Sequence, residues 1–203
     1  MSRRTSFLRH AVRLAALGLG FLALGDAQAG AALARFPSLN GNSIVFEAHG
    51  NLWRVDRKGG RAERLTSEPG YDLMPRYSPD GKWIAFTGQY QANTDVYVIP
   101  AAGGEARRLT FHSDVVDGAP ERWGPDNMVL GWTPDSKNVV FLSRRSSMNS
   151  WFGRYFTVPV EGGEEKLMPL DKGGAFSWSP DGKAIAYNRI FTNFRTWKRY
   201  TGG

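Results

Sequence analysis

The sequence is organised around one stretch, Ser78-Pro79-Asp80-Gly81-Lys82-Trp83-Ile84-Ala85-Phe86. Serine suits the first position of a β-turn, proline fixes φ at the second, and glycine tolerates positive φ at the fourth. The residues that follow the turn are mostly β-branched or aromatic and show no polar alternation, which is typical of a strand covered on both faces. The stretch therefore predicts a tight turn that leads into a buried β-strand.

The chain repeats this turn and strand. Two copies are close, at Ser179–Tyr187 and Thr133–Phe141, and a fainter one lies at Ser38–Phe46. The copy at Thr133–Phe141 carries Ser136 where the others carry glycine, so we expect its turn to be less favourable. The turn position moves by 40, 55 and 46 residues from one copy to the next. These steps are close to the roughly 40 to 50 residues of a four-stranded propeller blade.

A full repeat contains four predicted strands. A short strand leads into the turn, the apolar strand follows, and a third strand ends at a glycine pair that forms a hairpin to the fourth. The glycine pairs are Gly59-Gly60, Gly103-Gly104 and Gly162-Gly163, and the fourth strands end in Arg64-Leu65-Thr66, Arg108-Leu109-Thr110 and Lys166-Leu167-Met168. The pattern predicts an all-β chain, a β-propeller with four-stranded blades near residues 35–66, 73–110, 129–168 and 174–203.

The repeat at 174–203 contains only its first two strands, so the chain holds about three and a half blades. An open arc leaves an apolar blade face without a neighbour. We therefore expect residues 30–203 to be the N-terminal fragment of a longer propeller domain. The run Phe194–Tyr200 mixes aromatic and basic residues that could bind an anionic ligand, but we favour a connection whose aromatics pack on another blade.

The first 29 residues are typical of a secretory signal-peptide helix. They contain four arginines and one acidic residue, and their apolar run, Leu14–Leu24, is too short to span a bilayer. Ala27-Gln28-Ala29 fits the cleavage rule, so we expect a cut before Gly30. An uncleaved anchor is the alternative, and Ser2–Leu8 resembles a twin-arginine export signal with one residue too many before Phe7. The predicted location is periplasmic or secreted, without stable membrane insertion after cleavage.

Charge and cysteine content narrow the function classes. The formal net charge is +7, of which +3 lies in residues 1–29, so the basic balance is partly a targeting feature and does not indicate a nucleic-acid partner. The chain has no cysteine. Disulfides and thiolate metal sites are therefore excluded, and the composition suits an oxidising compartment.

No catalytic, cofactor-binding or metal-binding residue is predicted in this chain. His10 lies in the signal peptide, and His49 and His112 lie in polar loops without a second ligand at metal spacing. The sequence contains no nucleophile elbow, His-Glu-x-x-His or phosphate-binding loop. We read both loop histidines as ordinary surface residues and expect no cofactor.

Asp80, Asp135 and Asp181 recur in the same turn of successive blades. Turn formation explains them without any chemistry, and we expect them to lie far apart on a ring.

Three polar insertions lie at residues 90–93, 111–129 and 144–153. We expect them to be solvated connections at the rim or mouth of the propeller.

Several strings together resemble the start of tricorn protease and its bacterial homologues. The turn motif alone is shared by many propellers, whereas two strings in this order are much more specific, Gly131-Trp132-Thr133-Pro134-Asp135 and Arg195-Thr196-Trp197-Lys198-Arg199-Tyr200. Leu52–Val55, Ser78–Gly88 and Asp95–Pro100 also fit, and the resemblance covers residues 35–203. The exported N-terminus departs from a cytoplasmic location for such proteins.

The resemblance implies a large serine peptidase with a six-bladed propeller, a seven-bladed propeller, and a PDZ domain between two catalytic subdomains. Its nucleophilic serine would lie in a C-terminal part that has no counterpart here. This chain would then be a gate or docking scaffold for peptide substrates, within a homo-oligomer of the full-length protein. Two alternatives stay open: a non-enzymatic periplasmic propeller of the TolB type that acts by protein–protein contact, and the propeller of a prolyl-oligopeptidase-type enzyme.

Overall fold

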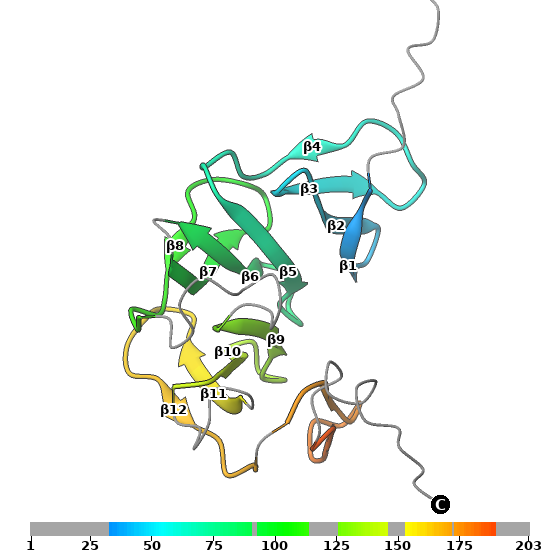
Figure 1. The fold of residues 1–203 in the computed structure, drawn as a ribbon. Coiled ribbons are helices and arrows are strands. Elements are labelled where there is room, and N and C mark those ends of the chain that lie inside the picture. Colours follow the sequence, from blue (N-terminus) through cyan, green and yellow to red (C-terminus); the bar gives the residue numbers. More distant parts are fainter. Residues whose placement is uncertain (1–32, 91–92, 114–125, 146–152, 172, 190–203) are drawn as a thin grey trace, which may run out of the picture. The chain divides into compact units, whose positions relative to one another are not determined.

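The computed structural model describes residues 33–90, 93–113, 126–145, 153–171 and 173–189, and every regular element in these ranges is a β-strand (Figure 1). The strands form four antiparallel sheets, which we call blades 1 to 4 in chain order. Blade 1 contains β1 (Arg35–Asn40), β2 (Ser43–Ala48), β3 (Asn51–Asp56) and β4 (Glu63–Arg64). Blade 2 contains β5 (Tyr71–Tyr77), β6 (Trp83–Tyr90), β7 (Asn93–Pro100) and β8 (Arg107–Arg108). Blade 3 contains β9 (Met128–Trp132), β10 (Asn138–Ser143), β11 (Arg154–Pro159) and β12 (Lys166–Leu167), and blade 4 contains β13 (Phe176–Trp178) and β14 (Ile185–Tyr187).

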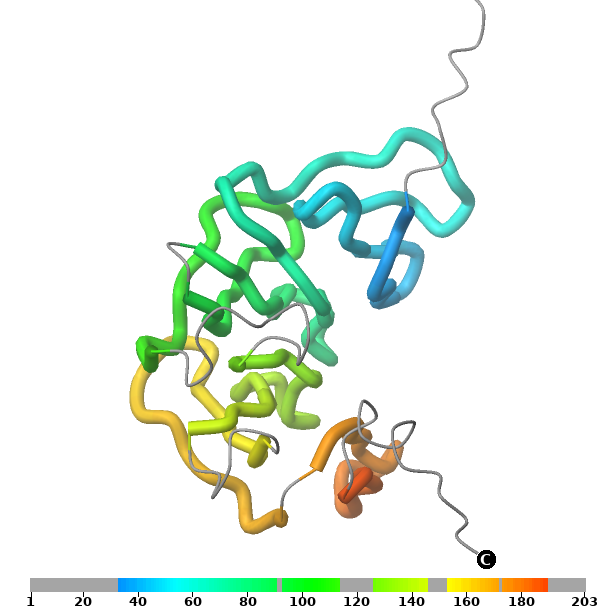
Figure 2. Tube along the Cα trace, in the orientation of Figure 1, coloured from blue at the N-terminus to red at the C-terminus, as the bar shows by residue number. Residues whose placement is uncertain are grey.

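Each blade is a meander, because its strands pair with their neighbours in sequence. The chain completes one blade before it enters the next, as the colours of Figure 2 show. In blade 2, β6 and β7 pair without a break from Trp83 opposite Pro100 to Tyr90 opposite Asn93. The predicted all-β fold with four-stranded propeller blades is therefore confirmed. No helix in the ranges given above is long and apolar enough to cross a membrane, and the predicted signal peptide lies outside them.

The predicted turns are closed by their own side chains. In blade 2, Ser78 Oγ donates to Asp80 Oδ1 at 2.6 Å and accepts the N–H of Trp83 at 3.0 Å. The N–H of Lys82 donates to the same Asp80 oxygen at 3.1 Å. These side chains therefore satisfy backbone donors of the tight turn. The same contacts recur in blades 3 and 4, with Thr133, Asp135, Lys137 and Asn138, and with Ser179, Asp181, Lys183 and Ala184.

Ser136 occupies the position that glycine takes in the other turns. Its φ is 61°, in the left-handed region where a side chain is disfavoured, as the sequence predicts. However, its hydroxyl accepts the N–H of Asp80 from blade 2 at 3.0 Å. The strained serine therefore makes a contact between blades that glycine could not make.

The glycine pairs form the predicted hairpins. Gly103 and Gly104 have φ values of 94° and 135°, which only glycine adopts at low cost. The N–H of Gly103 donates to the carbonyl of Pro100 at 2.8 Å and closes the turn. After the glycine pair and two further residues the chain enters the two-residue strand β8, which pairs with β7 only at Arg107 and Arg108.

Both faces of the central strands β6, β7 and β10 of blades 2 and 3 are buried, which explains why these strands carry little polar alternation. In β6, Ile84 and Phe86 belong to a cluster that also contains Leu52 of blade 1. The intervening Ala85 belongs to a second cluster, with Phe141 of blade 3. All five side chains are fully buried. Alternate residues of one strand thus join blade 2 to its two neighbours.

Side-chain hydrogen bonds also join the blades. Between blades 1 and 2, the hydroxyls of Ser43 and Tyr77 lie 2.8 Å apart. Between blades 2 and 3, Thr87 Oγ1 donates to the carbonyl of Asn127 at 2.9 Å and accepts the N–H of Val129 at 2.9 Å. A hydroxyl is placed here because it can donate and accept at once across a buried interface.

Blade 4 is represented by two strands, which pack on blade 3 through aromatic rings. The ring of Tyr155 lies 5.9 Å from that of Phe176 and 5.8 Å from that of Tyr187. The buried Trp178 Nε1 has no hydrogen-bond partner among the residues that the structure describes. The run Phe194–Tyr200, to which the sequence assigned a packing role, lies outside those residues.

Candidate functional site

The three turn aspartates, Asp80, Asp135 and Asp181, have structural roles. Each accepts hydrogen bonds from the Ser or Thr hydroxyl and a lysine N–H of its own turn, and these bonds hold its pKa below the ordinary value. The expectation that they lie far apart is wrong for adjacent blades, because Asp80 and Asp135 line one hollow of about 520 Å³. The hydrogen bonds within each turn account for these aspartates without any catalytic role.

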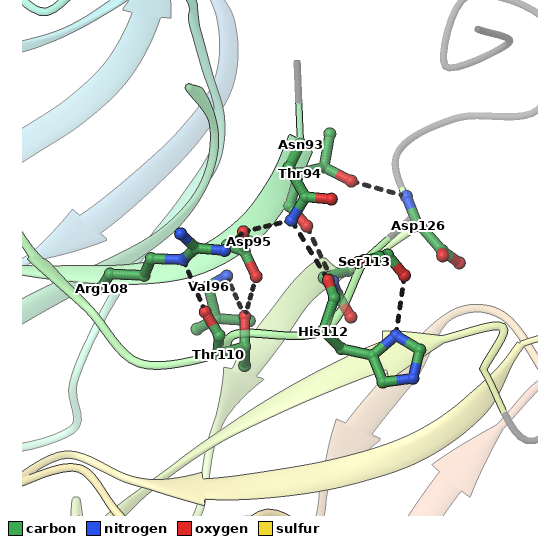
Figure 3. A network of polar contacts seen from close by, with 10 residues as sticks. Asn93, Thr94, Asp95, Val96, Arg108, Thr110, His112, Ser113 and Asp126 are labelled. Atoms are coloured by element: carbon green, nitrogen blue, oxygen red, sulfur yellow. Dashed lines mark hydrogen bonds and ion pairs between the residues drawn. The ribbon is translucent and has the colours of Figure 1, made fainter. Parts of the chain in front are cut away.

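A buried network of an acid and a threonine closes the outer part of blade 2 (Figure 3). Thr110 Oγ1 accepts the N–H of Val96 at 2.9 Å and donates to Asp95 Oδ1 at 2.7 Å. Arg108 Nη2 pairs with the other oxygen of Asp95 at 2.6 Å, and Asn93 Nδ2 donates to that oxygen at 2.5 Å. The repeated Arg-Leu-Thr ending is thus a lock that holds the two-residue strand β8 on β7.

Replacing Thr110 with valine is expected to lower the free energy of unfolding by about 1 to 3 kcal/mol, because the change leaves the N–H of Val96 and a lone pair of Asp95 unpaired in a fully buried site. Urea unfolding of the full chain measures the change. Thr157→Val in β11 is the matched control, since the hydroxyl of Thr157 makes no hydrogen bond to any residue that the structure describes, and it should change stability by less than about 0.5 kcal/mol. Equal effects of the two substitutions would contradict the role assigned to Thr110.

Blade 1 builds the same lock with an acid from the next blade. The N–H of Leu52 donates to Thr66 Oγ1 at 2.9 Å, and the Thr66 hydroxyl donates to Asp72 at the start of β5. Tyr90 OH, at the end of β6, donates to the other oxygen of Asp72 at 2.6 Å. The position that Asp95 holds in blade 2 is occupied in blade 1 by Asn51. The acid therefore comes from the neighbouring blade, and the lock also joins blades 1 and 2.

Asp72 is the most perturbed carboxyl of this region. It has no exposed surface, and burial raises its pKa to about 6, against the opposing effect of the hydrogen bonds from Thr66 and Tyr90. Burial and the bond to Asp72 raise the pKa of the Tyr90 hydroxyl, which therefore stays protonated. Asp72 is not placed for catalysis, because both of its oxygens are occupied by hydroxyl donors that hold the fold together.

A pocket of about 500 Å³ opens beside this lock, between the segment after β4 and strands β7 and β8. Leu65, Tyr97 and Ile99 line its buried side, and Glu68 and Glu105 line its exposed side. This pocket could not be predicted from the sequence, because its walls come from two different repeats that only the packing of blades brings together. It falls in the size range of small-molecule and side-chain binding sites.

The part of the chain that the structure describes places no metal-binding surroundings around the loop histidines. His112 Nδ1 lies 2.7 Å from the carbonyl of Ser113, and the carbonyl of His49 accepts a hydrogen bond from Asn51. Within the described ranges, no group of three or more His, Asp or Glu side chains could hold a metal ion. Most of the polar insertions at 111–129 and 144–153 lies outside those ranges.

These features define the class of protein as a β-propeller domain with four-stranded blades. The family model of the tricorn protease N-terminal beta propeller domain matches residues 31–203, and the chain belongs to this family. The resemblance seen in the sequence is thereby confirmed.

Two relatives illustrate the match. The chain is 31% identical over 173 residues to tricorn protease homolog 1 of Streptomyces coelicolor, which covers 83% of this chain and 15% of that protein. It is 25% identical over 171 residues to a putative tricorn-like protease N-terminal subunit of Sulfurisphaera tokodaii, covering 82% of this chain and 80% of that protein. The chain thus spans a small part of the first relative and most of the second.

Two solved structures share the fold. The crystal structure of the tricorn protease matches with a TM-score of 0.64 at 24% identity, covering 74% of this chain and 14% of that one. A putative TolB from Agrobacterium tumefaciens matches with a TM-score of 0.61 at 20% identity, covering 77% of this chain and 53% of that one. At these identities the likeness concerns the fold alone.

Proposed function

We propose that this chain is the propeller portion of an exported, tricorn-like serine peptidase that degrades peptides. The propeller serves as a gate or docking scaffold for the substrate and carries no catalytic residue of its own. The observation that supports this most is the family match over residues 31–203. Tricorn protease homolog 1 is far longer than this chain, so the catalytic serine of the proposed enzyme belongs to another part of the protein.

The test is to purify the product of the complete gene and to assay it with fluorogenic peptides and a fluorophosphonate probe that labels active serines. We expect peptide hydrolysis and covalent labelling of a segment outside residues 31–203. Light scattering on the same sample should give the mass of a homo-oligomer. A monomeric product that neither hydrolyses peptides nor reacts with the probe would contradict the proposal.

Export is part of the proposal, and it rests on the basic start, the apolar run and the Ala27-Gln28-Ala29 site of the sequence. N-terminal sequencing of the protein recovered from the periplasm or the medium should begin at Gly30. If the protein is recovered from the cytoplasm with its first residues intact, export is contradicted. The peptidase assignment does not depend on this result, because the preceding assays test it separately.

The alternative is a non-enzymatic periplasmic propeller of the TolB type that acts through protein–protein contact. It is favoured by the likeness to the putative TolB fold. It predicts a complete gene product that ends after about six blades and gives neither hydrolysis nor probe labelling, and so the same two assays separate the two functions.

A further inference from the structure

We propose that the pocket between blades 1 and 2 binds the cationic side chain of a lysine or arginine presented by a polypeptide. The pocket is the one formed by the segment after β4 together with β7 and β8. The inference goes beyond the proposed function, because it depends only on the pocket and holds whether or not the whole protein is a peptidase.

The buried side of the pocket suits the aliphatic stem and charged head of such a residue. Leu65 and Ile99 provide apolar surface for the methylene groups. Tyr90 and Tyr97 also line the pocket, and their rings meet edge to face with centroids 4.8 Å apart. Tyr97 is stacked in turn on the buried ring of Phe86, with centroids 5.6 Å apart. The two rings are thus held in place, and aromatic faces attract cations within about 6 Å.

The charges around the pocket favour a cation. Glu68 and Glu105 line it, and neither has an ion-pair partner among the residues that the structure describes. Arg108 is the cationic residue of the lining, but its charge is already matched by Asp95 at 2.6 Å. Its Nε donates to the carbonyl of Thr110 at 2.7 Å, so its guanidinium is bound within the protein on two sides. The pocket therefore presents uncompensated negative charge.

The residues behind the pocket strengthen this preference. The Tyr90 hydroxyl donates to Asp72 at 2.6 Å, which fixes the ring and directs its hydrogen away from the pocket. Thr66 also lines the pocket, and its hydroxyl accepts the N–H of Leu52 and donates to Asp72. The buried polar groups at this wall are thus satisfied within the protein. Apart from Ser67 and the paired Arg108, the lining offers a ligand apolar surface, aromatic rings and carboxylates, a combination that disfavours phosphate or carboxylate ligands and attracts an amine or a guanidinium.

The test is isothermal titration of the full chain at low ionic strength with three tripeptides, acetyl-Ala-Arg-Ala-amide, acetyl-Ala-Lys-Ala-amide and acetyl-Ala-Gln-Ala-amide. We expect the arginine and lysine peptides to bind at least about tenfold more tightly than the glutamine peptide, a difference of roughly 1.4 kcal/mol. Absence of binding at 10 mM of the arginine peptide, or equal affinity for the three peptides, would overturn the proposal.

Substitutions locate the binding. Glu68→Gln and Glu105→Gln together should weaken the arginine peptide about tenfold, and each alone should give part of that loss. Both side chains are exposed, so the variants should fold. Circular dichroism of each variant tests this. Glu164→Gln is the matched control, because Glu164 is exposed and follows its glycine pair in blade 3 as Glu105 does in blade 2, away from the pocket. Equal losses in the control and the double variant, or no loss in either, would overturn the assignment to this pocket.

Discussion

Replacing Phe86 with alanine is expected to lower the free energy of unfolding by about 3 to 5 kcal/mol. Phe86 is fully buried and belongs to the cluster that joins blade 1 to blade 2. Its ring also supports Tyr97 at 5.6 Å between centroids. The substitution leaves a cavity that the neighbouring strands cannot close, because β6 is held by β5 and β7 on its two sides. Urea unfolding followed by tryptophan fluorescence measures the change.

Phe111→Ala is the matched control for this experiment. The Phe111 side chain is 74% exposed, and its described ring contact is with Arg108, whose guanidinium lies 4.9 Å from the ring centroid. We expect a loss of at most about 1 kcal/mol. If the two substitutions lower the free energy of unfolding equally, the interface between blades 1 and 2 does not contribute the stability assigned to it.

The strands and turns could be predicted because their causes are local. The Ser-Pro-Asp-Gly turn is closed by Ser78 and Asp80, which are two residues apart and lie in the repeat itself. The lack of polar alternation in β6 predicts two covered faces, and Ile84 and Ala85 indeed belong to clusters on opposite sides. A repeated pattern of this kind determines the blade and the stacking of blades together.

The locks could be predicted only in part. Thr66 and Thr110 each accept the N–H of a residue fourteen positions earlier in the chain. The repeated Arg-Leu-Thr string at the strand ends is visible in the sequence, but the pattern alone assigned no role to its threonine. No feature of the sequence indicates that Asp72 supplies the carboxylate that blade 1 lacks at Asn51. Asp72 can do so only because β5 starts beside the last strand of the preceding blade, and this proximity depends on how the blades pack.

The proximity of neighbouring turns was missed for the same reason. The sequence shows that Asp80 and Asp135 recur at equivalent positions, but not how closely adjacent blades approach. The contact between the Asp80 N–H and Ser136 Oγ depends on the φ of 61° at Ser136. The serine that departs from the glycine of the repeat thus forms an interaction between blades. The pocket lined by Glu68 and Glu105 could not be predicted either, because it also depends on how closely adjacent blades approach.

The Asp72 carboxyl is expected to make the protein less stable as the pH rises from about 4 to about 6. Burial raises its pKa in the folded protein to about 6, above the ordinary value of 3.8 that holds in the unfolded chain. Between these values the folded protein binds the proton and the unfolded chain does not. The stabilisation is therefore complete below about pH 4 and is lost as the pH passes the folded value, by about 3 kcal/mol for a difference of roughly two pKa units.

Asp72→Asn isolates this effect, because an amide fills the same space and does not titrate. We expect the stability of the variant, relative to the natural protein, to rise by up to about 3 kcal/mol between pH 4 and pH 7. Urea unfolding at half-unit steps of pH measures it. Asp135→Asn is the control, since hydrogen bonds from Thr133 and Lys137 lower the pKa of that carboxyl below its ordinary value of 3.8. Its stabilisation is therefore complete above that value and is lost only as the pH falls below it, so the stability of this variant relative to the natural protein should change little between pH 4 and pH 7. If the difference between Asp72→Asn and the natural protein does not change with pH, Asp72 does not titrate in this range, and its carboxyl is held ionised by Thr66 and Tyr90 despite its burial.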